Sequence, residues 1–325
     1  MPSRRQILQA SAAAIGARWL ASGPIAAAEP NQDAPMTATP ELSIVDTHQH
    51  LWDLSKFKLA WHADAPQLAH SFVMKDYLAA TEGLGVVKSV YMEVDVEPSQ
   101  QLAEAEYVID LCQQGDNPMA AAVISGRPAA DDFAAYAKRF GGHKYVKGLR
   151  QVLHGAGTPP GYCLKSEFIR GIKLLGELGL SFDVCMRSSE MADADALAAA
   201  CPKTRLIVDH CGNMSVQETD AKQRKLWMDG LRALAQRDNV VCKVSGIVAS
   251  AKEDWQPADL APNINFTLDT FGPDRVMFGG DWPVCTLRST YRRWVEALKS
   301  IIATRPLADQ KKLLAGNALK FYGLA

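Results

Sequence analysis

The chain repeats one pattern eight times: a short run of β-branched or apolar residues, then a turn, then a longer segment with helical spacing. The eight predicted strands cover residues 43–50, 86–94, 119–125, 146–152, 180–186, 205–211, 240–246 and 276–281. Between them, apolar residues recur three and four positions apart, which predicts helices at 101–113, 131–140, 165–178, 192–200, 221–236 and 290–303. Alternating strands and helices favour a parallel sheet, and eight units are the number that closes a barrel. We therefore expect an α/β fold, a (β/α)8 TIM barrel, with an extra C-terminal helix at about 308–322.

The N-terminal segment differs in composition from the predicted barrel domain, residues 43–325. Ser3-Arg4-Arg5 precedes a weakly apolar, Ala-rich run that ends in Ala26-Ala27-Ala28, a typical site for signal cleavage. Paired arginines are typical of the twin-arginine route. We expect a signal peptide of the twin-arginine type at 1–28, a linker at 29–42 and a periplasmic or otherwise exported product. The alternative is an N-terminal extension without structure, with translation starting at Met36.

The charge balance and the hydropathy limit the classes of partner. The chain has 35 Lys and Arg against 36 Asp and Glu, a net charge of -1, so it lacks the basic excess that nucleic acid or an anionic membrane attracts. No stretch approaches 18 uncharged apolar residues, which argues against a membrane anchor. Seven cysteines without a C-x-x-C pair predict buried thiols, not a disulfide framework. The expected partners are a small-molecule substrate and, transiently, the twin-arginine export machinery.

The chemistry of a TIM barrel lies at the C-terminal ends of its strands. His48 and His50 end the first predicted strand and share a face, because alternate residues of a strand point the same way. His210 ends the sixth strand, and Asp281 follows Gly279-Gly280 at the end of the eighth. These four residues are the candidate catalytic group. The alternative is that the histidines are hydrogen-bonded core residues and that Asp281 caps a turn.

Six motifs in order resemble the amidohydrolase superfamily across residues 43–324, and in particular the amidohydrolase-related group with the sugar-lactone and pyrone-dicarboxylate lactonases. They are Asp46-Thr47-His48-Gln49-His50-Leu51-Trp52, Val146-Lys147-Gly148-Leu149-Arg150, Val208-Asp209-His210-Cys211-Gly212, Lys243-Val244-Ser245-Gly246, Phe278-Gly279-Gly280-Asp281-Trp282-Pro283 and Gly316-Asn317-Ala318. The resemblance implies that Asp281 takes the proton from an attacking water. It also implies that His48, His50 and His210 hold either the substrate carbonyl or a divalent metal, with Asp281 as a further metal ligand.

Two departures from the pattern concern the metal. Binuclear members of the superfamily carry a lysine at the end of strand four, whereas Lys147 lies near the start of that strand here. Members with a firmly held single metal add a histidine at the end of strand five, but no histidine lies between His154 and His210, and Met186-Arg187 occupies that position. We therefore expect at most one divalent metal, such as zinc, weakly bound or absent.

Further strand-end residues are candidates for substrate binding. Arg150 and Arg187 have the planar donor fork that binds a carboxylate or sugar hydroxyls, although either can instead form an ordinary salt bridge. The other candidates are Glu93, Ser245, Trp52, His154 and Trp282. Lys243 shares a face with Ser245 and is expected deeper inside as a paired core charge. Substrate specificity is expected in loops 51–75, 153–164 and 247–262.

The pattern as a whole predicts a lactonase that opens a small polar lactone, sugar-derived or carboxylated, by attack of water activated by Asp281. Two alternatives stay open at this point. One is a metal-dependent non-oxidative decarboxylase, which needs a firmly held metal. The other is a non-catalytic periplasmic barrel that binds a sugar.

Overall fold

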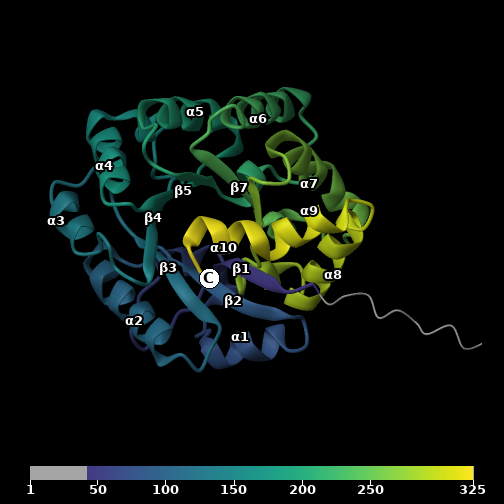
Figure 1. Cartoon of the computed structure of the whole chain (residues 1–325), viewed down its shortest axis with the longest axis horizontal. Coiled ribbons are helices and arrows are strands. Elements are labelled where there is room, and N and C mark those ends of the chain that lie inside the picture. Colours follow the sequence, from purple (N-terminus) through teal and green to yellow (C-terminus); the bar gives the residue numbers. More distant parts are fainter. Residues whose placement is uncertain (1–41, 325) are drawn as a thin grey trace, which may run out of the picture. The chain divides into compact units, whose positions relative to one another are not determined.

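Eight parallel strands follow one another around the barrel in sequence order (Figure 1). The computed structural model describes residues 42–324. The strands are β1 (Ile44–Gln49), β2 (Val86–Met92), β3 (Met119–Ser125), β4 (Val146–Val152), β5 (Ser181–Cys185), β6 (Leu206–Val208), β7 (Val240–Val244) and β8 (Val276–Phe278). Every residue of β1, β5, β6 and β8 is buried, as expected for strands covered on both faces.

The first and last strands meet and complete the ring. The amide of His50 donates to the carbonyl of Trp282 at 2.8 Å, and the amide of Asp281 donates to the carbonyl of His48 at 2.7 Å. These bonds lie just beyond the end of β8, beside the β1 histidines. The closure of the barrel therefore brings His48, His50 and Asp281 to one place, and the predicted TIM barrel is confirmed.

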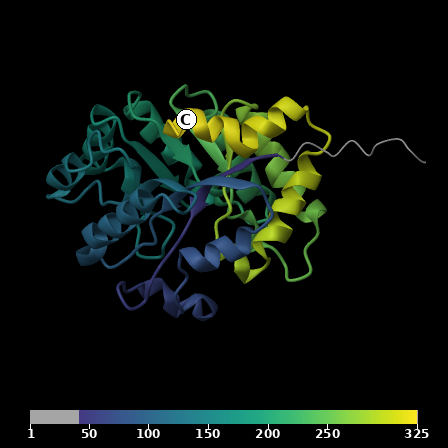
Figure 2. The ribbon, with the colours of Figure 1, turned by 60° about the horizontal axis from the view of Figure 1, so that its bottom comes forward.

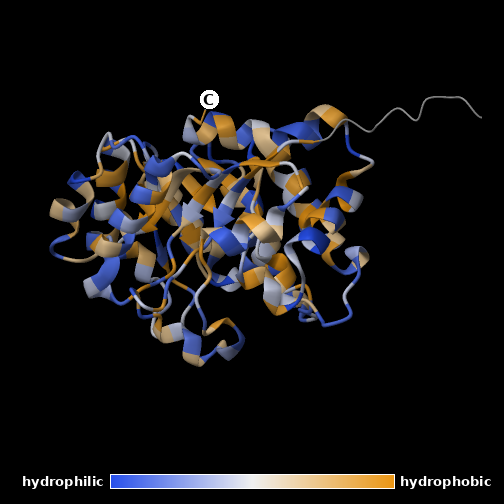
Figure 3. Cartoon of the chain, turned by 90° about the horizontal axis from the view of Figure 1, so that it is seen from below, coloured by the Kyte–Doolittle hydropathy of each residue, from blue (hydrophilic) through white to orange (hydrophobic). Residues whose placement is uncertain are grey.

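Helices alternate with the strands and surround them. They are α1 (Met74–Thr81), α2 (Gln101–Gln114), α3 (Phe133–Lys138), α4 (Ser166–Glu177), α5 (Met191–Ala200), α6 (Ala221–Leu234), α7 (Pro257–Phe271), α8 (Tyr291–Ile302), α9 (Leu307–Lys311) and α10 (Asn317–Tyr322). Two N-termini have side-chain caps: Asp220 accepts from the amide of Lys222 before α6, and Thr290 accepts from the amide of Arg293 before α8. In Figure 3, hydrophobic and hydrophilic colours alternate along the helices. This is the pattern of amphipathic helices on a buried sheet.

The two ends of the barrel are closed in different ways. At the N-terminal end, Tyr322 and Leu324 pack with the interior residues Val45, Val90 and Met277. The C-terminal helices α9 and α10, joined by a π-helical turn, thus plug the end opposite the long loop between β1 and α1 (Figure 2). The predicted C-terminal helix is confirmed, although it is interrupted. The open end, where the strands finish, is the end available for a site.

Several predicted boundaries were wrong. The predicted strand 205–211 ends at Val208, because the chain turns into a short helical segment at His210–Asn213. The predicted strand 276–281 ends at Phe278. The expected loop 247–262 contains a short 3-10 helix and the first residues of α7, a helix that begins at Pro257 and was not predicted. His210 and Asp281 therefore lie on the turns after their strands, where the backbone can aim them inward.

The predicted signal peptide at 1–28 and most of the predicted linker lie outside the described residues. Within residues 42–324, no helix combines the length and the apolar character needed to cross a bilayer. All seven cysteines are free and buried, as predicted.

Candidate active site

A cavity of about 560 Å³ opens at the C-terminal ends of the strands. Its wall includes residues that follow six of the eight strands and residues of the β1–α1 loop. The predicted site residues that line it are His50, Trp52, Arg150, His154, His210 and Asp281. His48 lies directly behind them, with its Nε2 atom 3.7 Å from Oδ1 of Asp281. The structure thus brings together all four residues of the candidate catalytic group.

Two glycines allow β8 to pass close to β1. A Cβ atom at Gly279 would lie 2.6 Å from Cβ of His48, and one at Gly280 would lie 2.6 Å from Oδ2 of Asp46. The small backbone also lets the amide of Gly280 donate to Asp46 at 2.7 Å. Asp281 itself has φ +53°, in the left-handed region that residues other than glycine rarely adopt. Backbone in this region is often found where a fold fixes a functional side chain.

The contacts of His50 assign its tautomer. Its Nδ1 atom lies 2.9 Å from the carbonyl oxygen of Met92, and a carbonyl can only accept, so Nδ1 carries the proton. In the neutral ring, Nε2 then presents a lone pair. Nε2 lies 3.2 Å from Oδ1 of Asp281. This oxygen is also an acceptor when the carboxyl group is ionised. Two acceptors at this distance need a proton or a cation between them.

His48 is held from both sides of its ring. Nη1 of Arg150 lies 3.2 Å from its Nε2, and a guanidinium can only donate, so this contact leaves the ring proton on Nδ1. Nδ1 faces Oδ1 of Asp209 at 3.5 Å, and neither atom has a hydrogen-bond partner in the described structure. Burial lowers the pKa of His48 well below its usual value, against the opposing effect of Asp209. His48 is therefore a neutral imidazole whose Nε2 lone pair points into the site.

Asp209 remains ionised beside this ring. Burial alone would raise its pKa, but the Lys243 ammonium at 3.6 Å and His48 hold the pKa well below its usual range. Lys243 also pairs with Asp183, and all three side chains are fully buried. This confirms the prediction of Lys243 as a paired core charge. Because the Lys243 ammonium keeps Asp209 ionised, the Asp209 carboxylate can accept a proton contact from Nδ1 of His48.

His210 reaches the site from a tight turn. It has φ +55°, and Cys211, Gly212 and Asn213 follow in the same region. A Cβ atom at Gly246 would lie 2.2 Å from Nδ1 of His210, so the ring lies against bare backbone. Nδ1 is 2.9 Å from the Ser245 hydroxyl, which can donate or accept. Burial lowers the pKa of His210, so this imidazole is also neutral.

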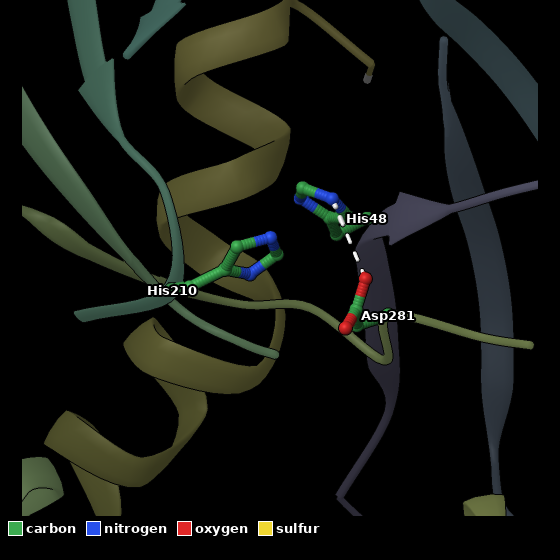
Figure 4. A group of neighbouring side chains, drawn as sticks. All are labelled: His48, His210 and Asp281. Carbon is green, nitrogen blue, oxygen red and sulfur yellow. Dashed lines mark ion pairs between the residues drawn. The ribbon is translucent and has the colours of Figure 1, made fainter. Parts of the chain in front are cut away.

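The arrangement fits a divalent metal. Ligand atoms of His48, His210 and Asp281 lie within 4.8 Å of one another (Figure 4). His50 adds a lone pair that faces the same carboxylate. Neutral imidazole nitrogens and a carboxylate oxygen are the ligand types that zinc binds. Cys185, Asp209 and His210 form a second group with the same spacing, but burial raises the pKa of the Cys185 thiol to about 12.

Arg150, predicted to bind substrate, is already engaged. Its Nε donates to Oε1 of Glu93 and its Nη2 to the Glu93 carbonyl, each at 2.7 Å, while Nη1 lies 3.4 Å from Asp209. The Arg150 side chain is 5% exposed and that of Glu93 is fully buried. The guanidinium therefore forms an internal ion pair at the floor of the cavity.

The other predicted binding residues fall into two groups. Trp52 and His154 line the cavity. Glu93, Ser245, Trp282 and Arg187 are not part of its wall. Ser245 lies behind His210, and the Trp282 ring packs against Phe72 at 5.4 Å. Arg187 donates to Glu190 and to the carbonyls of Gly155 and Thr158, and thereby fastens the loop after β4.

The sequence reasoning missed several residues of the site. Asp209 adjoins His210 and lies in one of the six motifs that carry the resemblance, but no role was predicted for it. Asp46 shares the face of His48 and His50, and its buried carboxylate accepts from the hydroxyls of Tyr77 and Tyr291 at 2.9 and 3.0 Å. Trp61 and Asp64 lie in loop 51–75, where specificity was expected, although neither was predicted as a binding residue, and Asn213 had no distinguishing pattern.

A family model described as amidohydrolase matches residues 45–324. This chain belongs to the amidohydrolase family. The L-fucono-1,5-lactonase of Burkholderia multivorans is 28% identical over 298 residues, which cover 86% of this chain and 96% of that protein. The 4-sulfomuconolactone hydrolase of Rhizobium radiobacter is 27% identical over 247 residues, 73% of this chain and 75% of that protein.

A crystal structure of an amidohydrolase from Burkholderia multivorans with bound zinc matches with a TM-score of 0.77 and 25% identity. The match covers 87% of this chain and 100% of that one. The predicted recognition of the family and of a hydrolase is confirmed.

Proposed function

We propose that this amidohydrolase is a lactonase that hydrolyses a small polar lactone with Asp281 as the general base. The observation that carries the proposal is the convergence of His48, His50, His210 and Asp281 at the floor of one cavity at the C-terminal end of the barrel. The names of the two curated relatives, a fuconolactonase and a sulfomuconolactone hydrolase, support a cyclic ester as the substrate.

Asp281 has one oxygen free for proton transfer. Its Oδ1 faces both β1 histidines, whereas Oδ2 has no hydrogen bond or ion pair in the described structure. A water beside Oδ2 transfers a proton to Asp281 as its oxygen forms a bond to the lactone carbonyl carbon. The tetrahedral intermediate then collapses, the ring C–O bond breaks, and the proton passes from Asp281 to the departing ring oxygen. The product is an open hydroxy acid.

The carbonyl oxygen gains negative charge during the attack, and His210 is placed to stabilise it. If the Ser245 hydroxyl donates to Nδ1, the ring carries its proton on Nε2 and donates it into the cavity. If Ser245 accepts instead, Nε2 presents a lone pair. Ser245 thus permits both roles that the sequence left open for His210, binding of the substrate carbonyl and binding of a metal.

A divalent metal, with zinc proposed, would be held by His48, His210 and Asp281 with His50 adjacent, and would polarise the carbonyl oxygen. The related crystal structure from Burkholderia multivorans holds zinc, which supports a divalent metal. The Arg150 guanidinium donates to the same lone pair of His48 that such a metal needs. We therefore propose a weakly held metal.

The test is hydrolysis of a panel of aldonolactones and carboxylated lactones, followed by proton release, with the protein as purified, after chelation and with added zinc. We expect turnover in at least one metal state. Asp281→Asn should lose about 10²–10⁴-fold in kcat, the usual contribution of a general base, with an unchanged melting temperature. Absence of lactone turnover in every state, together with tightly bound zinc, would favour a decarboxylase. Sugar binding that is unaffected by Asp281→Asn, without turnover, would favour a receptor.

We also propose that the protein is exported through the twin-arginine route. The support is the Ser3-Arg4-Arg5 segment followed by the Ala-rich run. Cell fractionation tests the proposal: the wild-type chain should reach the periplasm, and a variant with Arg4→Lys and Arg5→Lys should stay in the cytoplasm. Equal export of both chains would contradict it.

A further inference from the structure

Among residues 42–324, the cavity wall offers no lysine or arginine that is free to bind a substrate. Arg150 is the only lysine or arginine among the described residues of the wall. All three of its guanidinium nitrogens already contact Glu93, Asp209 or His48, and its partners are fully buried. Pulling it toward a substrate anion would leave a buried carboxylate without its partner, which is strongly unfavourable.

The imidazoles of His154 and His210 in the wall are neutral, because burial lowers the pKa of both, and other free polar atoms of the wall are acceptors. Asp64, exposed at the end of the short helix η1 (Ala60–Ala63), has no side-chain hydrogen bond or ion pair in the described structure. Asn213 donates through Nδ2 to the carbonyl of Met186, which leaves its Oδ1 without a donor. Of the other two carboxylates in the wall, Asp281 is the proposed general base, and Asp95 pairs with Arg127 at 2.7 Å. Hydroxyl groups can donate to such atoms, whereas a carboxylate or sulfonate cannot.

One wall of the cavity is aromatic. Trp52 and Trp61 meet edge to face with ring centroids 5.4 Å apart. Their indole N–H groups donate to the carbonyls of His70 and Val94, so neither remains for a ligand. Trp52 is fully buried, so it is the half-buried Trp61 ring that offers a flat carbon surface, which suits the C–H face of a sugar ring.

We infer that the site selects uncharged, polyhydroxylated lactones over lactones that carry a carboxylate or sulfonate, and that Asp64 is a specificity-determining residue. The inference rests on the proposed lactonase function and narrows its substrate class. An anionic substituent would meet Asp64 at the mouth and, away from the proposed metal position at the histidines, no free lysine or arginine among the described residues of the wall. Hydroxyl groups would meet acceptors, and the sugar ring would lie on Trp61.

The experiment compares lactones that differ in one group. In each pair, an aldono-1,4-lactone has a terminal CH₂OH where the matching aldaro-1,4-lactone has a carboxylate. We expect the wild-type protein to favour the uncharged member by about 100-fold in kcat/KM at pH 8, where free imidazoles are neutral. Asp64→Asn should lower this ratio of kcat/KM values, and Asp64→Arg should lower it further, mainly because KM for the charged lactone falls. Added salt should weaken the effect, as for exposed charges.

Asp53→Asn is the matched control. Asp53 lies in the same loop but pairs with Lys56 and is outside the cavity wall. This variant should keep the wild-type ratio. Similar hydrolysis of both lactones by the wild-type protein, or the same ratio in Asp64→Arg as in wild type, would overturn the inference while leaving the lactonase proposal intact. Hydrolysis of neither class in any metal state would refute the lactonase proposal itself.

Discussion

Gly246→Ala should inactivate the enzyme while leaving most of its stability. The added Cβ would lie 2.2 Å from Nδ1 and 2.5 Å from Cγ of His210. Ordinary contact needs more than about 3.4 Å, so the ring must move by about 1 Å. That movement breaks the 2.9 Å contact of Nδ1 with Ser245. Misplacement of a catalytic group by about 1 Å costs about 10²-fold in rate, which is the loss we expect in kcat/KM.

Backbone strain must be separated from this displacement. Gly246 has φ +59°, and alanine in this region costs about 1–2 kcal/mol. Gly179 provides the control, because it has φ +74° and an added Cβ would meet nothing within 4 Å. Each variant should lose a few degrees of melting temperature, about 2–4 °C per kcal/mol for a domain of this size. Only Gly246→Ala should lose activity, measured by proton release from a hydrolysed lactone. Full activity in Gly246→Ala, or an equal loss in Gly179→Ala, would refute the reasoning.

Three further changes test other parts of the site. Ser245→Ala should lower kcat/KM by about 10-fold or more, because His210 loses the partner that orients it, and an unchanged value would rule out that role. Arg150→Gln should bind zinc about 10-fold more tightly, measured against a chelating dye, because the lone pair of His48 becomes free. Arg150→Lys keeps the positive charge and so separates loss of the charge from loss of the contact with His48. Unchanged zinc affinity in Arg150→Gln would contradict the proposal that Arg150 and the metal compete for His48. Burial raises the pKa of Glu104 from 4.5 to about 8 in the folded protein. As pH rises between these values, Glu104 ionises in the unfolded chain before it does so in the folded one, so the wild type loses stability. Glu104→Gln should remove this loss and be more stable than wild type at pH 8 but not at pH 5 in urea unfolding, whereas the same difference at both pH values would contradict the shift.

Most of the fold could be predicted because each βα unit has its own local sequence pattern. β3 and β6 are short apolar runs and α4 is an amphipathic helix, and the alternation of such segments along the chain specified the barrel. α7 was missed because Pro257, Pro262 and its asparagines hide the helical pattern. In the folded chain Pro257 starts the helix, at a position where its missing N–H costs nothing.

The site could be predicted only as far as strand ends identify it. His48, His50 and Asp281 were recognisable because closure of a barrel forces β1 and β8 together. The turn that carries His210 was not, because only Gly212 adopts positive φ without steric cost, and a run of four such residues that includes Cys211 is not expected from the sequence. Tertiary contacts impose that backbone, and no local pattern records them.

The ion-pair partners of the charged residues could not be predicted either, because they too depend on tertiary contacts. Arg150 can reach a substrate or a neighbouring carboxylate with the same donor fork, and the sequence does not say which comes closer. In the structure Arg150 pairs with Glu93 and Asp209, since a guanidinium that is only 5% exposed would be too costly without carboxylates beside it. Because Lys243 holds Asp209 and Asp209 faces His48, the charges below the cavity are fixed before a substrate arrives. With those cations already paired, the carboxylate formed by opening a lactone finds no free positive charge among the described residues of the cavity wall. The electrostatic arrangement that disfavours an anionic substrate therefore also favours release of the product.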